Sequence, residues 1–171
     1  MRPERLKKLA RHLDSLAVRD RDRIRREQKI EAIRRVAAVR LHTLCADFVR
    51  DVNIAVTSVT LEISPTEFSP DAFQESGTNV FQINVSGRVI QFVFEGTESL
   101  LSTENLRVPY TLEGSVRWFN QDMLDRDEIK DTPLFCCVEG DSGEWRYYDS
   151  RTHRSGSIDD EYLAALLEQL V

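Results

Sequence analysis

The chain has 171 residues, enough for one domain with an appendage. Hydrophobic residues make up 41% and charged residues 30%, which excludes a disordered or low-complexity protein. The formal net charge of −6 conceals two parts of opposite sign. Residues 1–50 hold 15 Lys and Arg against seven Asp and Glu, whereas residues 51–171 hold eight against 22.

The first twenty residues carry charge throughout and lack the apolar core of a secretory signal peptide. No apolar run approaches the roughly 18–20 residues that cross a bilayer. The three cysteines, Cys45, Cys136 and Cys137, are odd in number, and two of them are adjacent. This usage favours a reducing compartment over a disulfide framework. We therefore expect a soluble, cytoplasmic protein that binds no membrane.

A long helix is predicted at the start of the chain. Up to about residue 50 there is no glycine, and the only proline, Pro3, stands where a first helical turn tolerates one. Two apolar stripes have helical spacing: Leu6, Leu9, Leu13 and Leu16, then Ile30, Ile33, Ala37, Leu41, Leu44 and Phe48. Arg19–Lys29 between them is polar, so the alternatives are one continuous helix or two that meet near Val18–Asp22. We expect the continuous helix because no Gly, Pro or Asn marks a turn.

The long helix and the contrast in charge together predict a division of the chain into two parts. These are a basic arm, residues 1–50, and a compact acidic α+β domain, residues 51–171. The second stripe of the helix has the spacing to dock on the domain. Its first stripe is then left to pack on another chain, or to fold back on its own domain. Leu6–Leu16 covers only about two heptads, fewer than the three to four that indicate a coiled coil.

After residue 51 the pattern favours strands. Val52–Ser64 is β-branched and alternating, with a change of phase near Ser58 that indicates a bulge or an overrunning helix. Pro65–Thr78 is predicted to be a loop in which Ser69-Pro70-Asp71 starts a helical turn. Thr78–Glu95 is predicted to be a hairpin that turns at Ser86-Gly87. That register pairs Val85 with Arg88, Ile83 with Ile90 and Phe81 with Phe92.

The remaining elements are shorter. We expect helices at Thr97–Asn105, Asn120–Lys130 and Ser157–Val171, and strands at Leu106–Leu112, Ser115–Asn120, Thr132–Glu139 and Glu144–Asp149. The last two strands would pair Glu139 with Glu144 and send Cys136 and Cys137 to opposite faces. The fold class is therefore α+β, a long N-terminal helix followed by an antiparallel sheet of hairpins with short helices and a C-terminal helix.

Three groups of residues are candidates for chemistry. Five basic residues of the polar segment, Arg19, Arg23, Arg25, Arg26 and Lys29, could contact phosphates. The acidic residues interleaved with them favour a solvated, salt-bridged helix instead. Glu128-Ile129-Lys130 has the Glu-x-Lys spacing of metal-dependent nucleases but is placed at a helix end. His42 and Cys45 are one helical turn apart, yet a zinc site needs three or four ligands.

No nucleophile elbow, phosphate loop, dinucleotide fingerprint or zinc-protease motif occurs. We therefore predict no catalytic residue, no metal and no cofactor. The preferred function is a non-catalytic protein-interaction module, such as an adaptor, small subunit or chaperone-like factor. It would bind another protein, or a second copy as an oligomer, through Leu6, Leu9, Leu13 and Leu16. The alternative is a nucleic-acid-associated factor that uses the basic residues, and the third hypothesis is a metal-dependent hydrolase.

Overall fold

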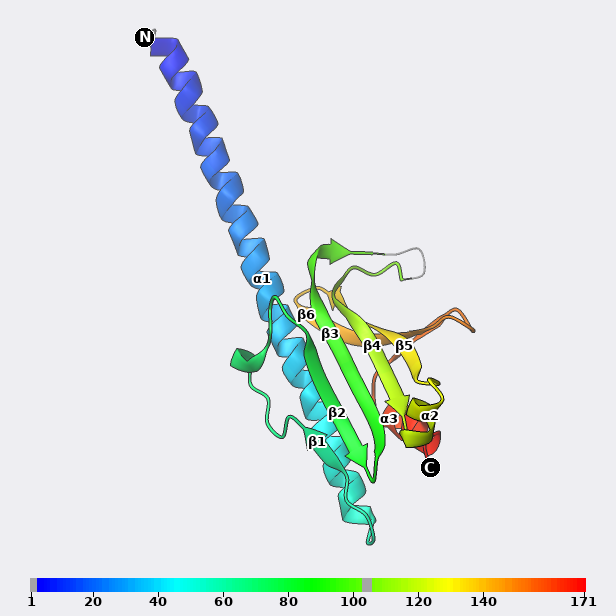
Figure 1. Ribbon diagram of the computed structural model, residues 1–171. Coiled ribbons are helices and arrows are strands. Elements are labelled where there is room, and N and C mark those ends of the chain that lie inside the picture. The colour runs from blue at the N-terminus through cyan, green and yellow to red at the C-terminus, as the bar shows by residue number, and fades with distance from the viewer. Residues whose placement is uncertain (1–2, 103–105) are drawn as a thin grey trace. The chain divides into compact units, whose positions relative to one another are not determined.

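An unbroken helix, α1, begins at Pro3 and ends at Ala55 (Figure 1). The computed structural model describes residues 3–102 and 106–171, and the chain divides into two units, Met1–Ala32 and Ile33–Val171. The continuous helix is confirmed, since the polar segment Arg19–Lys29 consists largely of good helix formers and contains no helix breaker. The division lies inside α1, at the point where its side chains begin to be buried.

In the described part of the chain, seven strands follow α1 and form one sheet in chain order, with every neighbouring pair antiparallel. The strands are β1 (Glu62–Ser64), β2 (Asn79–Val85), β3 (Arg88–Leu101), β4 (Tyr110–Phe119), β5 (Lys130–Glu139), β6 (Ser142–Asp149) and β7 (Arg154–Ser157). The helices after α1 are the short 3-10 helix η1 (Pro70–Ala72), α2 (Gln121–Asp125) and α3 (Asp160–Glu168). The α+β fold class is confirmed.

The hairpin of β2 and β3 has the predicted register, with Val85 opposite Arg88 and Phe81 opposite Phe92. Ser86 and Gly87 both have positive φ, 50° and 79°, as a tight two-residue hairpin turn requires. The predicted turn that starts at Ser69-Pro70-Asp71 is also present, as η1. Local turn chemistry was sufficient in both places because few backbone conformations join such closely spaced segments.

Strand occupies only the end of the predicted segment Val52–Ser64, and of the two alternatives for its change of phase the overrunning helix is the one observed. Val52–Ala55 forms the last turn of α1, and only Glu62–Ser64 is strand. Extending an existing helix needs no new nucleus, which outweighs the weak β preference of a few branched residues. The Asn53 side chain then holds the loop, donating to the carbonyl of Leu61 at 3.0 Å and accepting from its N–H at 2.8 Å.

The predicted helix Thr97–Asn105 is also wrong. Residues 97–101 end β3, and residues 103–105 lie outside the described part of the chain. The Thr97 hydroxyl lies 2.6 Å from the carbonyl oxygen of Ser99 and 3.1 Å from that of Thr111, on the neighbouring strand β4. The pairing of this segment with β4 depends on residues distant in the sequence. Local periodicity carries no signal of such pairing, so the sequence pattern could not predict that β3 continues here.

Leu106–Leu112 and Ser115–Asn120, predicted as two strands around Glu113-Gly114, are replaced by the single strand β4. Gly114 lies opposite Phe94, and a Cβ at this glycine would lie 1.8 Å from the carbonyl oxygen of Val93. Glycine is therefore needed here for the close approach of two strands rather than for a turn.

The end of the predicted helix Asn120–Lys130 and the register of the hairpin that follows it differ from the prediction. Asn120, the first residue of the predicted helix, caps α2 by accepting from the N–H of Met123 at 2.9 Å, but the helix ends at Asp125 and not at Lys130. In the next hairpin Glu139 pairs with Ser142 instead of Glu144. This shift of two residues preserves the faces because side chains alternate with a period of two.

The C-terminal helix is shorter than Ser157–Val171. It comprises Asp160–Glu168, and Asp159 caps it by accepting from the N–H of Tyr162 at 2.9 Å. Ser157 belongs instead to β7, which pairs with β6 from Arg154 onward. The predicted helix is therefore present, but it begins three residues later and ends three residues earlier than expected.

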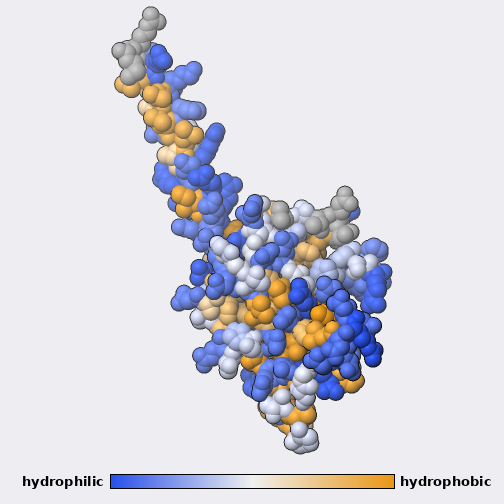
Figure 2. Space-filling model, in the orientation of Figure 1, coloured by the Kyte–Doolittle hydropathy of each residue, from blue (hydrophilic) through white to orange (hydrophobic). Residues whose placement is uncertain are grey.

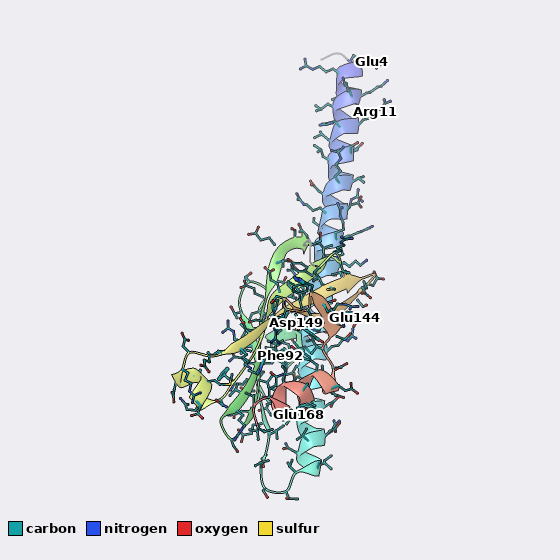
Figure 3. The ribbon with its side chains drawn as sticks, turned by 90° about the vertical axis from the view of Figure 1, so that its right-hand side faces the viewer. Glu4, Arg11, Phe92, Glu144, Asp149 and Glu168 are labelled. Atoms are coloured by element: carbon teal, nitrogen blue, oxygen red, sulfur yellow. The ribbon has the colours of Figure 1, made fainter. Side chains whose placement is uncertain are left out.

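One face of the sheet is covered by the second part of α1 and by α3 (Figure 1). Leu41 of α1, Phe92 of β3 and Leu163 of α3 belong to the same buried cluster, and Figure 3 shows Phe92 among the packed side chains of this layer. On the opposite face a smaller cluster is formed by Leu106, Tyr110 and Cys137 with Val108 and Phe135. Cys136 and Cys137 thus lie on opposite faces, as predicted.

Candidate functional site

Four leucines form a line along the helix of the first unit. Leu6, Leu9, Leu13 and Leu16 are 52%, 49%, 55% and 40% exposed. At about 100° of helical rotation per residue they fall within an arc of about 80°. Figure 2 shows hydrophobic surface gathered along one side of this helix between hydrophilic side chains. We call these four residues the leucine stripe.

The leucine stripe stops at a polar position. One turn beyond Leu16 the same line is occupied by Asp20, and further on by Ile24 and Glu27. Asp20 pairs with Arg23 at 3.6 Å. On the other sides of the helix the side chains of Glu4 and Arg11 point away from its axis (Figure 3). The apolar surface is therefore a short, bounded patch.

The five candidate phosphate-binding residues divide between two sides of the helix. Arg19, Arg23 and Arg26 follow one another at spacings of four and three, so they share a flank beside the leucine stripe. Arg25 and Lys29 lie on another side and do not join them. All five side chains are exposed, and Arg26 donates to the carbonyl oxygen of Asp22 at 3.4 Å.

Metal chemistry is not supported by the placement of the remaining candidates. His42 Nε2 donates to the carbonyl oxygen of Pro65 at 2.7 Å, and its ring packs against Phe68 and Phe81. Cys45 is fully buried, and burial raises the pKa of its thiol to about 12. Over residues 3–102 and 106–171, no three His, Cys, Asp or Glu side chains are grouped to hold a metal ion.

The Glu-x-Lys motif is not built into a catalytic strand. Glu128 lies in the connection between α2 and β5, and Lys130 is the first residue of β5. Both side chains are exposed, and so is that of Asp131.

The second unit contains a cavity of about 610 Å³ between α3 and the strands β4, β5 and β6. Its aromatic lining includes Trp118, Tyr147 and Tyr162. The rings of Tyr147 and Tyr162 stack with centroids 4.3 Å apart and planes inclined by 13°. The Trp118 indole N–H donates to Gln169 Oε1 at 3.1 Å, joining β4 to the end of α3.

The cavity has no net preference for a charged ligand. Lys130 and Arg151 are matched along its lining by Asp131 and Asp149. The backbone N–H of Arg151 donates to Asp149 at 2.9 Å and holds the pKa of that carboxyl below its usual value. Burial raises the pKa of Tyr162, whose hydroxyl is inaccessible and has no well-formed hydrogen bond within the described residues.

Sequence reasoning missed this cavity, although a signal was present. Lys130 and Asp149 have the strand parity of core-facing residues, Leu134 on β5 and Tyr147 on β6. Because side chains alternate along a strand, these two charged residues point to the same face as the core residues, and both line the cavity. Nothing in the sequence indicated that α3 would form its other wall.

One buried charge holds the second unit together. Arg34 lies within α1, and the residue is only 8% exposed. It donates to Thr111 Oγ1 at 2.7 Å, to the carbonyl of Thr97 and to Glu75. Thr97 and Thr111 lie where the β3–β4 and β4–β5 registers shift, so the guanidinium satisfies polar groups that the irregular strands leave free.

Within the described residues, no helix is both long enough and apolar enough to span a membrane. Comparison of the chain with protein-family models, with curated proteins and with solved structures finds no match.

Proposed function

We propose that the chain is a non-catalytic protein-interaction module, such as an adaptor, small subunit or chaperone-like factor. The observation that carries the proposal is the leucine stripe, four leucines that are each about half exposed. Complete burial of a leucine contributes about 1.5–3 kcal/mol, so covering the exposed half of each contributes about 1 kcal/mol. Contiguous apolar surface with polar borders is typical of protein interfaces.

Charge supports a protein partner and sets its salt dependence. Residues 1–32 hold eleven basic and six acidic residues, whereas residues 33–171 hold twelve and 23. Attraction between a basic helix and an acidic partner surface speeds encounter and weakens as salt rises.

Three free, buried cysteines are consistent with the reducing, cytoplasmic location that we propose with this function.

The test compares two substitutions in the full chain. Leu9→Asp places a carboxylate in the leucine stripe. Val18→Asp places one outside the stripe, nine residues later and about 180° around the same helix. The two side chains are 49% and 51% exposed, so their loss affects the isolated helix similarly. Circular dichroism checks that both variants retain the helix.

The expected result is a defined protein, identified by mass spectrometry, that co-purifies with the original chain and Val18→Asp but not with Leu9→Asp. Direct titration of purified components must reproduce the difference. If Leu9→Asp keeps every bound protein and every self-association of the original chain, the proposed function is wrong.

A second candidate is a nucleic-acid-associated factor, favoured by the common flank of Arg19, Arg23 and Arg26. Fluorescence anisotropy with duplex and single-stranded oligonucleotides tests it. Phosphate contacts require that affinity falls steeply with salt, and that replacing these three arginines with glutamine reduces the slope. Absence of binding at low salt excludes this candidate.

A further inference from the structure

We propose that the leucine stripe binds a second copy of this chain in antiparallel orientation, an inference that rests on the proposed function. The spacing of the four leucines is three, four and three residues, which is the same in both directions along the helix. Two copies placed head to tail therefore bring leucine against leucine in every layer. Leu6 meets Leu16 of the second copy, and Leu9 meets Leu13.

Such a pair is closed by a two-fold axis, since each copy presents the same surface to the other. All eight leucines are used, and each is between 40% and 55% exposed before pairing. A partner without this symmetry would need its own apolar groove of matching length. The second copy supplies the complement with no further requirement.

Parallel pairing is opposed by the residues that follow the leucine stripe. In a parallel pair in the same register, Asp20 would face Asp20 and Glu27 would face Glu27 along the same line. Like charges directly opposite one another are destabilising. Antiparallel pairing centred on the leucines leaves Glu27 beyond the overlap and separates the two copies of Asp20.

The two borders of the leucine stripe differ, and this sets how the pair responds to salt. Ala10 and Ala17 lie on one border, where small side chains permit close approach of the helices. Arg5 and Arg19 lie on the other, where antiparallel pairing brings Arg5 of one copy towards Arg19 of the second. Screening of this repulsion strengthens the pairing as salt rises, opposite to the effect of salt on binding to an acidic partner.

The size of the patch indicates a reversible association. A stable protein interface buries about 1,200–2,000 Å² in total, and four half-exposed leucines from each copy provide less. Dimer formation should therefore depend on concentration in the micromolar range.

Sedimentation equilibrium of the full chain, from about 1 to 500 µM, measures this association. We expect a reversible monomer–dimer equilibrium that strengthens with salt. Leu9→Asp should raise the dissociation constant by more than about tenfold because each dimer contains the change twice. Val18→Asp on the opposite side should leave it nearly unchanged.

Orientation is tested with Leu6→Cys and Leu16→Cys in separate full chains, under oxidised glutathione. The natural thiols Cys45, Cys136 and Cys137 are buried, so the introduced thiols react without interference while the chain is folded. Antiparallel pairing predicts that a mixture of the two variants forms the mixed disulfide in preference to either homodimer. Homodimer disulfides of each variant alone, without the mixed species, would overturn the orientation.

A chain that remains monomeric at all these concentrations, or a dimer that Leu9→Asp leaves intact, also overturns this inference. The proposed function survives the first outcome if Leu9→Asp still abolishes binding of a defined heterologous protein. It fails only when Leu9→Asp changes neither self-association nor any other binding. The two experiments therefore show separately whether the second copy is the partner and whether the leucine stripe is an interface at all.

Discussion

Replacement of Arg34 by methionine is the most severe test of how the second unit is held together. The change keeps an unbranched chain in the same helix but removes the guanidinium. Three acceptors then lose their donor: Thr111 Oγ1, the carbonyl of Thr97 and the carboxylate of Glu75. One oxygen of Glu75, Oε2, is already buried without a hydrogen bond, so the methionine variant leaves a carboxylate with no compensation.

The magnitude follows from burial. A surface ion pair contributes about 0–1 kcal/mol, but Arg34 and Glu75 have side chains that are only 10% and 27% exposed. Breaking a buried pair by removing one partner costs about 3–5 kcal/mol because the other charge stays desolvated. We expect Arg34→Met to reduce the free energy of unfolding by about this amount.

Urea denaturation of the full chain, followed by tryptophan fluorescence, measures the change because both tryptophans lie in the second unit. Addition of Glu75→Gln removes the stranded charge and should recover about 1–3 kcal/mol of the loss. Arg35→Met is the matched control, since Arg35 donates only an exposed hydrogen bond to Pro70, at 3.1 Å. It should cost less than about 1 kcal/mol.

A loss below about 1 kcal/mol for Arg34→Met would refute the assignment of this side chain to a buried network. So would a double variant whose loss of stability equals the sum of the two single losses, because additivity would show that the two charges are not coupled.

Four further predictions concern the same unit. Gly114→Ala should lower the melting temperature sharply, with a loss above about 3 kcal/mol, because its Cβ would lie 1.8 Å from the carbonyl oxygen of Val93. Cys45 and Cys136 should react with a disulfide reagent at pH 8.5 only after unfolding, since burial raises the pKa of each thiol to about 12. The folded thiols keep protons that the unfolded ones lose above pH 9.0, so the free energy of unfolding should fall between about pH 9 and 12. Asp159→Ala should cost about 1 kcal/mol in urea denaturation through loss of the cap on α3.

The sequence alone was sufficient where the relevant interactions are local. The unbroken helix from Pro3 followed from the absence of Gly, Pro and Asn breakers, and the hairpin at Ser86-Gly87 followed from alternation on both sides of a turn. The leucine stripe also belongs to this class, since helical spacing alone places its members on one line. These features depend on neighbours within a few residues, which the sequence displays directly.

Tertiary structure decided the features that depend on residues far apart in the chain. Gly114 is a residue type common in turns, but here it permits the close approach of β3 to β4. Thr97 is a residue type common at helix N-caps, but its hydroxyl lies 3.1 Å from the carbonyl oxygen of Thr111 on the neighbouring strand. Arg34 resembles its exposed neighbours in a basic helix, yet the shifted strands give it buried acceptors. The aromatic cavity beneath α3 likewise needs two distant segments. The physical reason is that the contacts between distant segments determine which residues are buried, which approach closely and which find hydrogen-bond partners. A local sequence pattern indicates only the secondary structure and the apolar face that one segment can form.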